Sequence, residues 1–223
     1  MIPIRDKNPT RRFPIVNVIL IAVNVVVFFY EVSLGGKLEF LFSRFAVIPT
    51  HIVLALQSPT IHVASFFPLI TSLFLHGGWV HLLGNMLYLW VFGDNVEDKL
   101  GRGRYIVFYL MCGLSASLLH VYVDPTSALP TVGASGAISG VLGAYLLLFP
   151  KARVVTLIPI FFFIQIAELP ALAVLGLWFV MQFFNGIASL GTNSAGMGGV
   201  AWWAHIGGFA AGCVLVFPFR KFR

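Results

Sequence analysis

The sequence predicts an all-α membrane protein, a bundle of six transmembrane helices with a long membrane-associated loop between the first two. Of its 223 residues, 59% are hydrophobic and 10% are charged, whereas a soluble domain carries about 25% charged residues. The apolar residues form blocks that suit a bilayer core of ~30 Å, which a helix of about 20 residues crosses. The blocks are continuous, and a membrane barrel would need strands of alternating polarity.

The six predicted spans follow one another along the chain. They cover residues 13–34, 80–92, 105–123, 134–149, 171–187 and 201–219. The first block is longer than the core of a signal peptide and has no clear cleavage site, so we expect a retained span. No internal repeat or linker interrupts the pattern, and residues 1–223 are expected to form a single domain.

The basic residues predict how the chain is oriented. Twelve of the 14 Lys and Arg residues fall at the termini or in the connections after spans two and four, and only Lys37 and Arg44 fall on the other side. Cytoplasmic loops carry the excess of Lys and Arg, so we expect both termini in the cytoplasm. The net charge of +6 is explained by this pattern, and no nucleic-acid partner is expected.

The first connection, residues 35–79, does not resemble a solvated loop. It is apolar and aromatic, and it contains three prolines and few charges. A loop of this length without obvious regular structure is usually functional or disordered, and its hydrophobicity argues against disorder. We therefore expect it to lie partly in the membrane interface, packed on the bundle.

Polar side chains inside the spans are the candidates for function, because they are costly at membrane depth. His81, Ser135 and His205 lie on spans two, four and six, each 13 to 15 residues before the cytoplasmic end of its helix. At 1.5 Å per residue, all three lie ~20–22 Å from that end. Asn85 follows His81 by four residues and shares its helical face. The sequence thus predicts one polar layer in the outer half of the bundle.

Small residues favour close contact between spans four and six. Gly136, Gly140 and Gly143 follow Ser135, and Ala204, Gly208 and Gly212 surround His205 at intervals of four. Faces of this kind let membrane helices approach until their backbones touch. Contact between them would bring Ser135 and His205 within hydrogen-bonding reach, the arrangement of a serine activated by a base.

The remaining polar groups favour a dyad with an oxyanion hole. Ser135 is expected to open its helix, where free N–H groups and the helix dipole suit an anion, and His81 and Asn85 can both donate hydrogen bonds. No acidic residue lies at this depth to orient His205, and the HExxH motif of zinc proteases is absent. Cys112 and Cys213 lie in apolar blocks as hydrophobic side chains, so no metal or cofactor is expected.

Each of these features also has a structural explanation when taken alone. A Gly-x-Ser-Gly segment is commonly a packing face, and His81, Asn85 or His205 could simply bond between helices. Ser139 is interpreted as packing, His76 as structural, and the remaining histidines as loop or interface residues, namely His51, His62 and His120. The combination of the four side chains in one layer favours a catalytic site.

Three segments resemble the rhomboid intramembrane serine proteases. They are HLLGN at 81–85, GASG at 133–136 and AHIGG at 204–208 followed by Gly212. The resemblance implies Ser135 as nucleophile, His205 as general base and acid, and His81, Asn85 and the Ser135 N–H as the oxyanion hole. It also implies single-span membrane proteins as substrates, a prokaryotic plasma membrane, and span five with the loop 188–200 as gate and cap over a site open to the outside.

The chain departs from the family pattern at two places. Many rhomboids carry Trp-Arg in the first loop, where this chain has Phe67-Pro68, and some carry an aromatic residue against the histidine, where this chain has Ser139. The alternatives are a rhomboid-like protein without activity and a small channel or transporter. The first would lack the serine or the histidine, and the second would have polar residues along a path reaching both sides.

Overall fold

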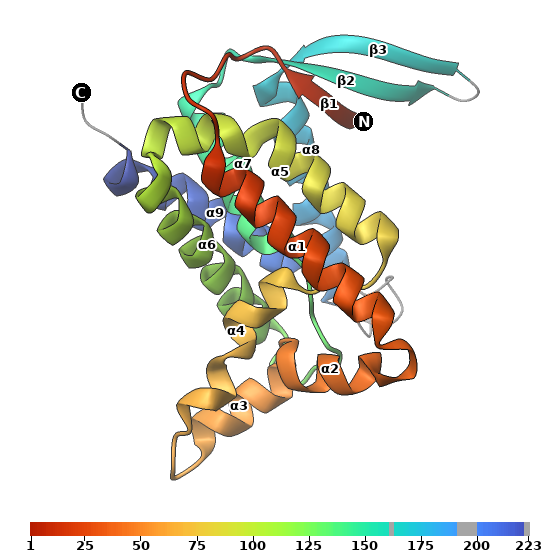
Figure 1. Ribbon diagram of the computed structural model, residues 1–223, viewed down its shortest axis with the longest axis vertical. Helices are drawn as coiled ribbons and strands as arrows, with labels where there is room; N and C mark the ends of the chain where they lie inside the picture. The colour runs from red at the N-terminus through yellow and green to blue at the C-terminus, as the bar shows by residue number, and fades with distance from the viewer. Residues whose placement is uncertain (161–162, 191–199, 221–223) are drawn as a thin grey trace.

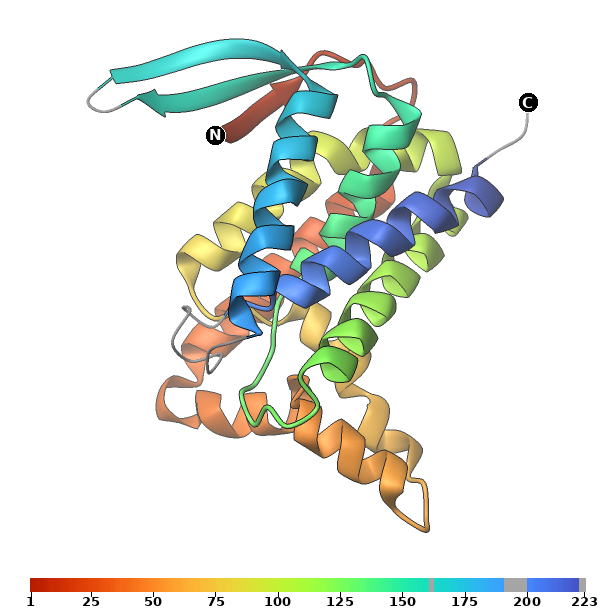
Figure 2. The same ribbon diagram turned by 180° about the vertical axis from the view of Figure 1, so that it is seen from behind.

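The computed structural model describes residues 1–160, 163–190 and 200–220, and shows a bundle of helices with a small sheet at one end (Figure 1). The long helices are α1 Ile15–Ser33, α5 Trp79–Leu100, α6 Arg102–Val123, α7 Ser135–Leu148, α8 Ala171–Ser189 and α9 Trp202–Phe219. α7 is the inner helix, because ten consecutive residues from Gly136 to Tyr145 are buried. Helices α5, α6, α8 and α9 pack around it, and α1 packs on α5 and α6 (Figure 2).

The described helices meet the length and composition of a membrane span to different degrees. α1, α6, α8 and α9 are long and apolar enough by themselves, and the segment Val63–Phe74 with α5 forms a pair bent by 80° that passes as one unit. α7 is apolar but has only 14 residues. The described part of the chain thus contains four candidate spans, or five with the bent pair, and the six-span count stays a prediction.

The expectation of an all-α fold is wrong at one end of the bundle. Strands β1 Ile2–Asp6, β2 Arg153–Ile160 and β3 Phe163–Pro170 form an antiparallel sheet in the order β1-β2-β3. β2 is rich in Val, Ile and Thr, and β3 contains Phe and two Ile, residues that suit a pleated strand. Runs of eight residues are hard to recognise in a sequence dominated by apolar blocks of transmembrane length. In addition, β1 pairs with β2 across about 150 residues of sequence.

Helix α5 continues beyond the predicted end of span two, residue 92. Its last two turns are polar, and Glu97 there accepts hydrogen bonds from the backbone N–H groups of Val16 at 3.2 Å and Asn17 at 2.7 Å. These N–H groups open α1 and have no partner within that helix. The polar end of α5 therefore caps α1 and holds the two helices in register.

The long connection between α1 and α5 consists of short helices. These are η1 Gly35–Lys37, α2 Leu38–Phe45, α3 Pro49–Gln57, η2 Val63–Phe66, α4 Pro68–Thr71 and η3 Ser72–Phe74, at the end of the bundle opposite the sheet (Figure 1). Val47, Ile52 and Leu69 form a small core with Val121 of α6. The predicted packing of this segment on the bundle is confirmed, and its position at the membrane interface stays a prediction.

The closest helix contact joins α7 and α9 through glycines. A Cβ on Gly208 would overlap the carbonyl oxygen of Gly136, and a Cβ on Gly212 would overlap that of Gly140. The small-residue faces meet as their spacing predicts, and backbone touches backbone along this seam.

Candidate active site

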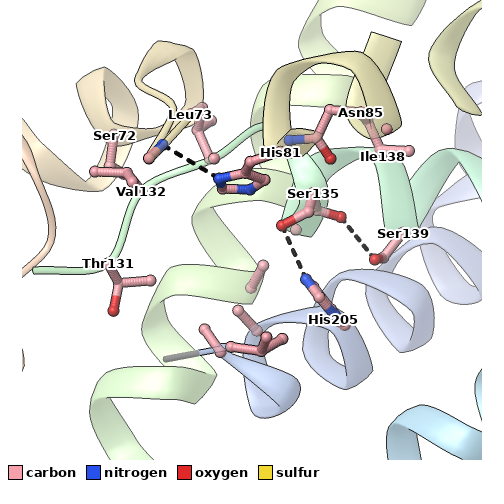
Figure 3. A pocket seen from close by; sticks show the side chains of 18 of the residues that line it. Ser72, Leu73, His81, Asn85, Thr131, Val132, Ser135, Ile138, Ser139 and His205 are labelled. Carbon is pink, nitrogen blue, oxygen red and sulfur yellow. Dashed lines mark hydrogen bonds between the residues drawn. The ribbon is translucent and has the colours of Figure 1, made fainter. Parts of the chain in front are cut away.

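The polar residues singled out from the sequence meet where three helices begin. His81 lies in the first turn of α5, Ser135 is the first residue of α7, and His205 lies in the first turn of α9. With Asn85 one turn further along α5, they line a cavity of about 860 Å³ (Figure 3). The convergence of helix N-termini gives the cavity a positive potential that favours an anion.

Ser135 and His205 are in direct contact. Nε2 of His205 lies 2.9 Å from Oγ of Ser135, across the α7–α9 seam (Figure 3). This distance is that of a hydrogen bond between a hydroxyl and an imidazole. The glycine contacts one and two turns further along hold the two backbones at this separation.

His81 points its second ring nitrogen at the space beside the serine. The backbone N–H of Gly77 donates to Nδ1 at 3.3 Å, so a neutral ring carries its proton on Nε2. A Cβ at Gly133 would lie 2.6 Å from Nε2 of His81 and 3.5 Å from Oγ of Ser135. Gly133 also has a φ of +128°, a backbone conformation that residues with a side chain rarely adopt. Because Gly133 has no side chain, the space between Nε2 of His81 and Oγ of Ser135 stays open.

Asn85 supplies a second donor. Its side chain is 8% exposed, and its Nδ2 has no hydrogen-bond partner among the described residues. Buried amide donors are almost always paired, so an unpaired one lining this cavity suits a bound acceptor. The backbone N–H groups at the start of α7 have no intrahelical partners and add to the same set of donors.

The neighbouring polar residues have structural roles. Ser139 donates to the carbonyl oxygen of Ser135 at 2.6 Å, which fits its interpretation as a packing residue. His76 is buried, and its backbone N–H lies 3.1 and 3.2 Å from the two carboxylate oxygens of Glu31. The interpretation of His120 as a loop or interface residue is wrong, because it is buried on α6 and bonds Thr131 at 3.0 Å.

One residue of the site was missed in the sequence. Gln182 of α8 places Oε1 2.7 Å from Nδ1 of His205. The available signal was a polar side chain inside a predicted span, but nothing in the sequence relates it to a histidine 23 residues later. The predicted cap loop 188–200 lies largely outside the described residues, since 191–199 are not among them.

Metal binding finds no support in the part of the chain that the structure describes. No group of three or more His, Cys, Asp or Glu side chains there is close enough to hold an ion. Cys112 and Cys213 are free thiols beside the α7–α9 seam.

The family model of the Rhomboid domain matches residues 63–222, which include the whole site and most of the chain. The chain belongs to the rhomboid family. It is a mostly helical, multi-pass integral membrane protein.

Several curated rhomboids are similar to it over part of their length. The "Presenilin-associated rhomboid-like protein A, mitochondrial" of Danio rerio is 34% identical over 130 residues, 56% of this chain and 34% of that protein. "Rhomboid protein 1, mitochondrial" of Saccharomyces cerevisiae is 32% identical over 159 residues, 68% of this chain and 41% of that protein. "Rhomboid protease GluP" of Bacillus subtilis is 39% identical over 92 residues, 41% of this chain and 18% of that protein. The chain thus spans less than half the length of these relatives.

Proposed function

We propose that this rhomboid is an intramembrane serine endopeptidase that cleaves transmembrane segments of membrane proteins through an acyl-enzyme. The observation that carries the proposal is the 2.9 Å contact between Oγ of Ser135 and Nε2 of His205 inside a cavity lined by hydrogen-bond donors. Membership of a family that includes a protein named rhomboid protease supports the same conclusion.

The contacts of the site support the following role for each residue. His205 accepts the Ser135 proton through Nε2 as the hydroxyl attacks the substrate carbonyl, and returns it to the leaving amine. The developing oxyanion receives hydrogen bonds from Nε2 of His81, Nδ2 of Asn85 and the backbone N–H groups that open α7. Water then attacks the ester at Ser135, with His205 again as base, and releases the second product.

The proposed substrates are single-span membrane proteins in the same bilayer. A helix has its backbone groups satisfied internally, so the scissile peptide has to leave its helix to reach Ser135. A cavity at the N-terminal ends of α5, α7 and α9 fits cleavage near the outer end of the substrate's span. We further propose six spans, a prokaryotic plasma membrane and cytoplasmic termini, on the charge pattern and the family resemblance.

The test compares wild type with Ser135→Ala and His205→Ala. The purified proteins are incubated in detergent with a single-span model substrate and, separately, with a fluorophosphonate probe that labels activated serines. Wild type should cleave and be labelled, and both variants should lose at least 10³-fold in rate. Ser115→Ala is the matched control, because that half-buried serine of α6 does not line the cavity and donates to the backbone carbonyl oxygen of Met111. Cleavage and labelling that persist in Ser135→Ala would rule out the proposed nucleophile.

A further inference from the structure

Gln182 connects the outer helix α8 to the proposed catalytic pair. Val174, Trp178, Gln182 and Gly186 recur at intervals of four and form the face that α8 turns toward α9. Gln182 is 7% exposed, and its Oε1 lies 2.7 Å from Nδ1 of His205. The rings of Trp178 and Trp202 lie 6.1 and 6.2 Å from the same imidazole, measured between centroids.

The direction of this hydrogen bond determines what the other ring nitrogen can do. An amide oxygen only accepts, so Nδ1 of His205 carries the proton and donates it to Oε1. In the neutral ring Nε2 then holds a lone pair, 2.9 Å from Oγ of Ser135. The opposite tautomer would present an N–H to the serine and could not remove its proton.

Trp178 and Trp202 lie beside the ring of His205, but an indole has no acceptor for the proton on Nδ1. Among the described residues no carboxylate bonds His205, and the residue one turn after Ser135 is Ser139, whose hydroxyl bonds the Ser135 carbonyl instead. Ser139 offers no ring for the imidazole to pack against. Among the described contacts, the 2.7 Å bond at Nδ1 is therefore the one that selects the tautomer of His205, and it adds to the contacts that restrict the rotation of the ring.

We propose that Gln182 is a positioning residue that holds His205 in the Nδ1–H tautomer with Nε2 directed at Ser135, which makes the site a serine–histidine–glutamine arrangement. The inference rests on the proposed function, because it assigns Gln182 a role through the general base. It also makes the activity depend on α8, since the hydrogen bond joins that helix to the pair on α7 and α9.

The test uses two substitutions of matched length. Gln182→Met keeps the bulk of the side chain and removes the acceptor, whereas Gln182→Glu keeps the length and can only accept. Gln182→Met should lower kcat about 10- to 100-fold with KM within about twofold, because an unoriented base acts on bound substrate. The rate of fluorophosphonate labelling should fall by the same factor. Gln182→Glu should recover both rates to within a few-fold of wild type.

Val174→Ala is the packing control, because Val174 is buried on α8 about two turns before Gln182 and does not line the cavity. It should keep kcat and the labelling rate. If kcat falls equally in Val174→Ala and Gln182→Met, or if Gln182→Glu does not recover it, Gln182 acts only through packing and the proposal is overturned.

A spectroscopic measurement separates this proposal from the proposed function. In protein with ¹⁵N-labelled histidine, the His205 ring should show a protonated Nδ1 in wild type and lose that preference in Gln182→Met. This readout does not depend on turnover. An unchanged tautomer in Gln182→Met would overturn the role of Gln182 even if Ser135→Ala abolishes cleavage, and cleavage by Ser135→Ala would refute the nucleophile whatever the tautomer.

Discussion

At the scale of single residues, the direction of each hydrogen-bond donor determines what the cavity can bind. The Nδ2 of Asn85 is buried and has no partner among the described residues, and Nε2 of His81 faces Ser135 across Gly133. A buried donor without a partner destabilises the free protein, because it has lost its hydrogen bonds to water. A bound acceptor offsets this cost, and a charged acceptor offsets it most.

Asn85→Ala should therefore slow catalysis without weakening substrate binding to a similar degree. Loss of one oxyanion donor costs about 10²–10³ in kcat, and KM should change little because the bond forms chiefly in the transition state. Steady-state cleavage of a single-span substrate measures both. Leu83→Ala, on the exposed side of α5, is the control. A change confined to KM would assign Asn85 to substrate binding instead.

Ser135, His205, His81 and Asn85 could be found from the sequence because each is a polar group at a recognisable spacing in an apolar block. Gln182 could not, because its significance lies in a contact between two helices and not in either helix alone. His120 was misread for a similar reason. It lies near the end of a predicted span, and only its contacts in the folded chain show that it is buried.

At the scale of the elements, the α7–α9 seam sets the distance between the proposed nucleophile and the proposed base. The Cβ of an alanine at Gly212 would overlap the carbonyl oxygen of Gly140, which is backbone and cannot rotate away. α9 would have to shift, and His205 lies two turns earlier on the same helix. The geometry of the pair thus depends on glycines that do not line the cavity.

Gly212→Ala should lower both stability and activity. Overpacking a tight contact costs about 1–3 kcal/mol, and a displacement of ~1 Å at the reacting groups costs about 10²-fold in rate. Thermal unfolding in detergent and the rate of fluorophosphonate labelling measure the two effects. Gly176→Ala on α8 is the matched control, because its Cβ would meet no atom within 4 Å. An active, stable Gly212→Ala would show that the seam can open.

The half-buried carboxyl group of Asp6 links strand β1 of the sheet to the bundle. Oδ2 of Asp6 in β1 accepts hydrogen bonds from Tyr145 of α7 at 2.6 Å and from Asn95 of α5 at 2.9 Å. Burial raises the pKa of Asp6 above its ordinary value of 3.8, even though the hydrogen bond from Tyr145 opposes the shift. The cost of burying the charged form exceeds the benefit of the bonds it accepts.

A raised pKa in the folded state fixes the sign of the pH dependence. The stability contributed by the protonated Asp6 carboxyl is fully present below pH 3.8 and is lost as the pH rises through its folded pKa. The free energy of unfolding of wild type, measured relative to Asp6→Asn, should therefore decrease as the pH rises over that range. Denaturant titrations at several pH values test this.

Glu168→Gln provides a control of opposite sign. The hydrogen bond from Lys7 lowers the pKa of the exposed Glu168 carboxyl below its ordinary value of 4.5. Its contribution is therefore present above pH 4.5 and lost as the pH falls. A parallel pH response of the two variants would contradict the assignment to Asp6.

At the scale of the whole molecule, the sequence predicts the bundle well and the sheet not at all. Continuous apolar blocks determine where long helices form, and small-residue spacing determines which of them touch. The sheet depends on pairing between the N-terminus and residues 153–170, and a local pattern cannot reveal partners so far apart. The apolar block 134–149 also predicts the short inner helix α7, although its 14 residues are few for a span.

The arrangement of the whole chain in the membrane gives the last prediction. Twelve of the 14 basic residues fall on one side of the proposed topology, which predicts that the termini and the sheet lie in the cytoplasm. In a Cys213→Ala background, with Cys112 buried, single cysteines are introduced at Leu129 before α7 and at Lys151 after it. Both residues are exposed. In intact cells, a membrane-impermeant thiol reagent should label Leu129→Cys and leave Lys151→Cys unlabelled until the cells are lysed. Labelling of Lys151→Cys alone would invert the topology and place the start of α7, with Ser135, on the cytoplasmic side.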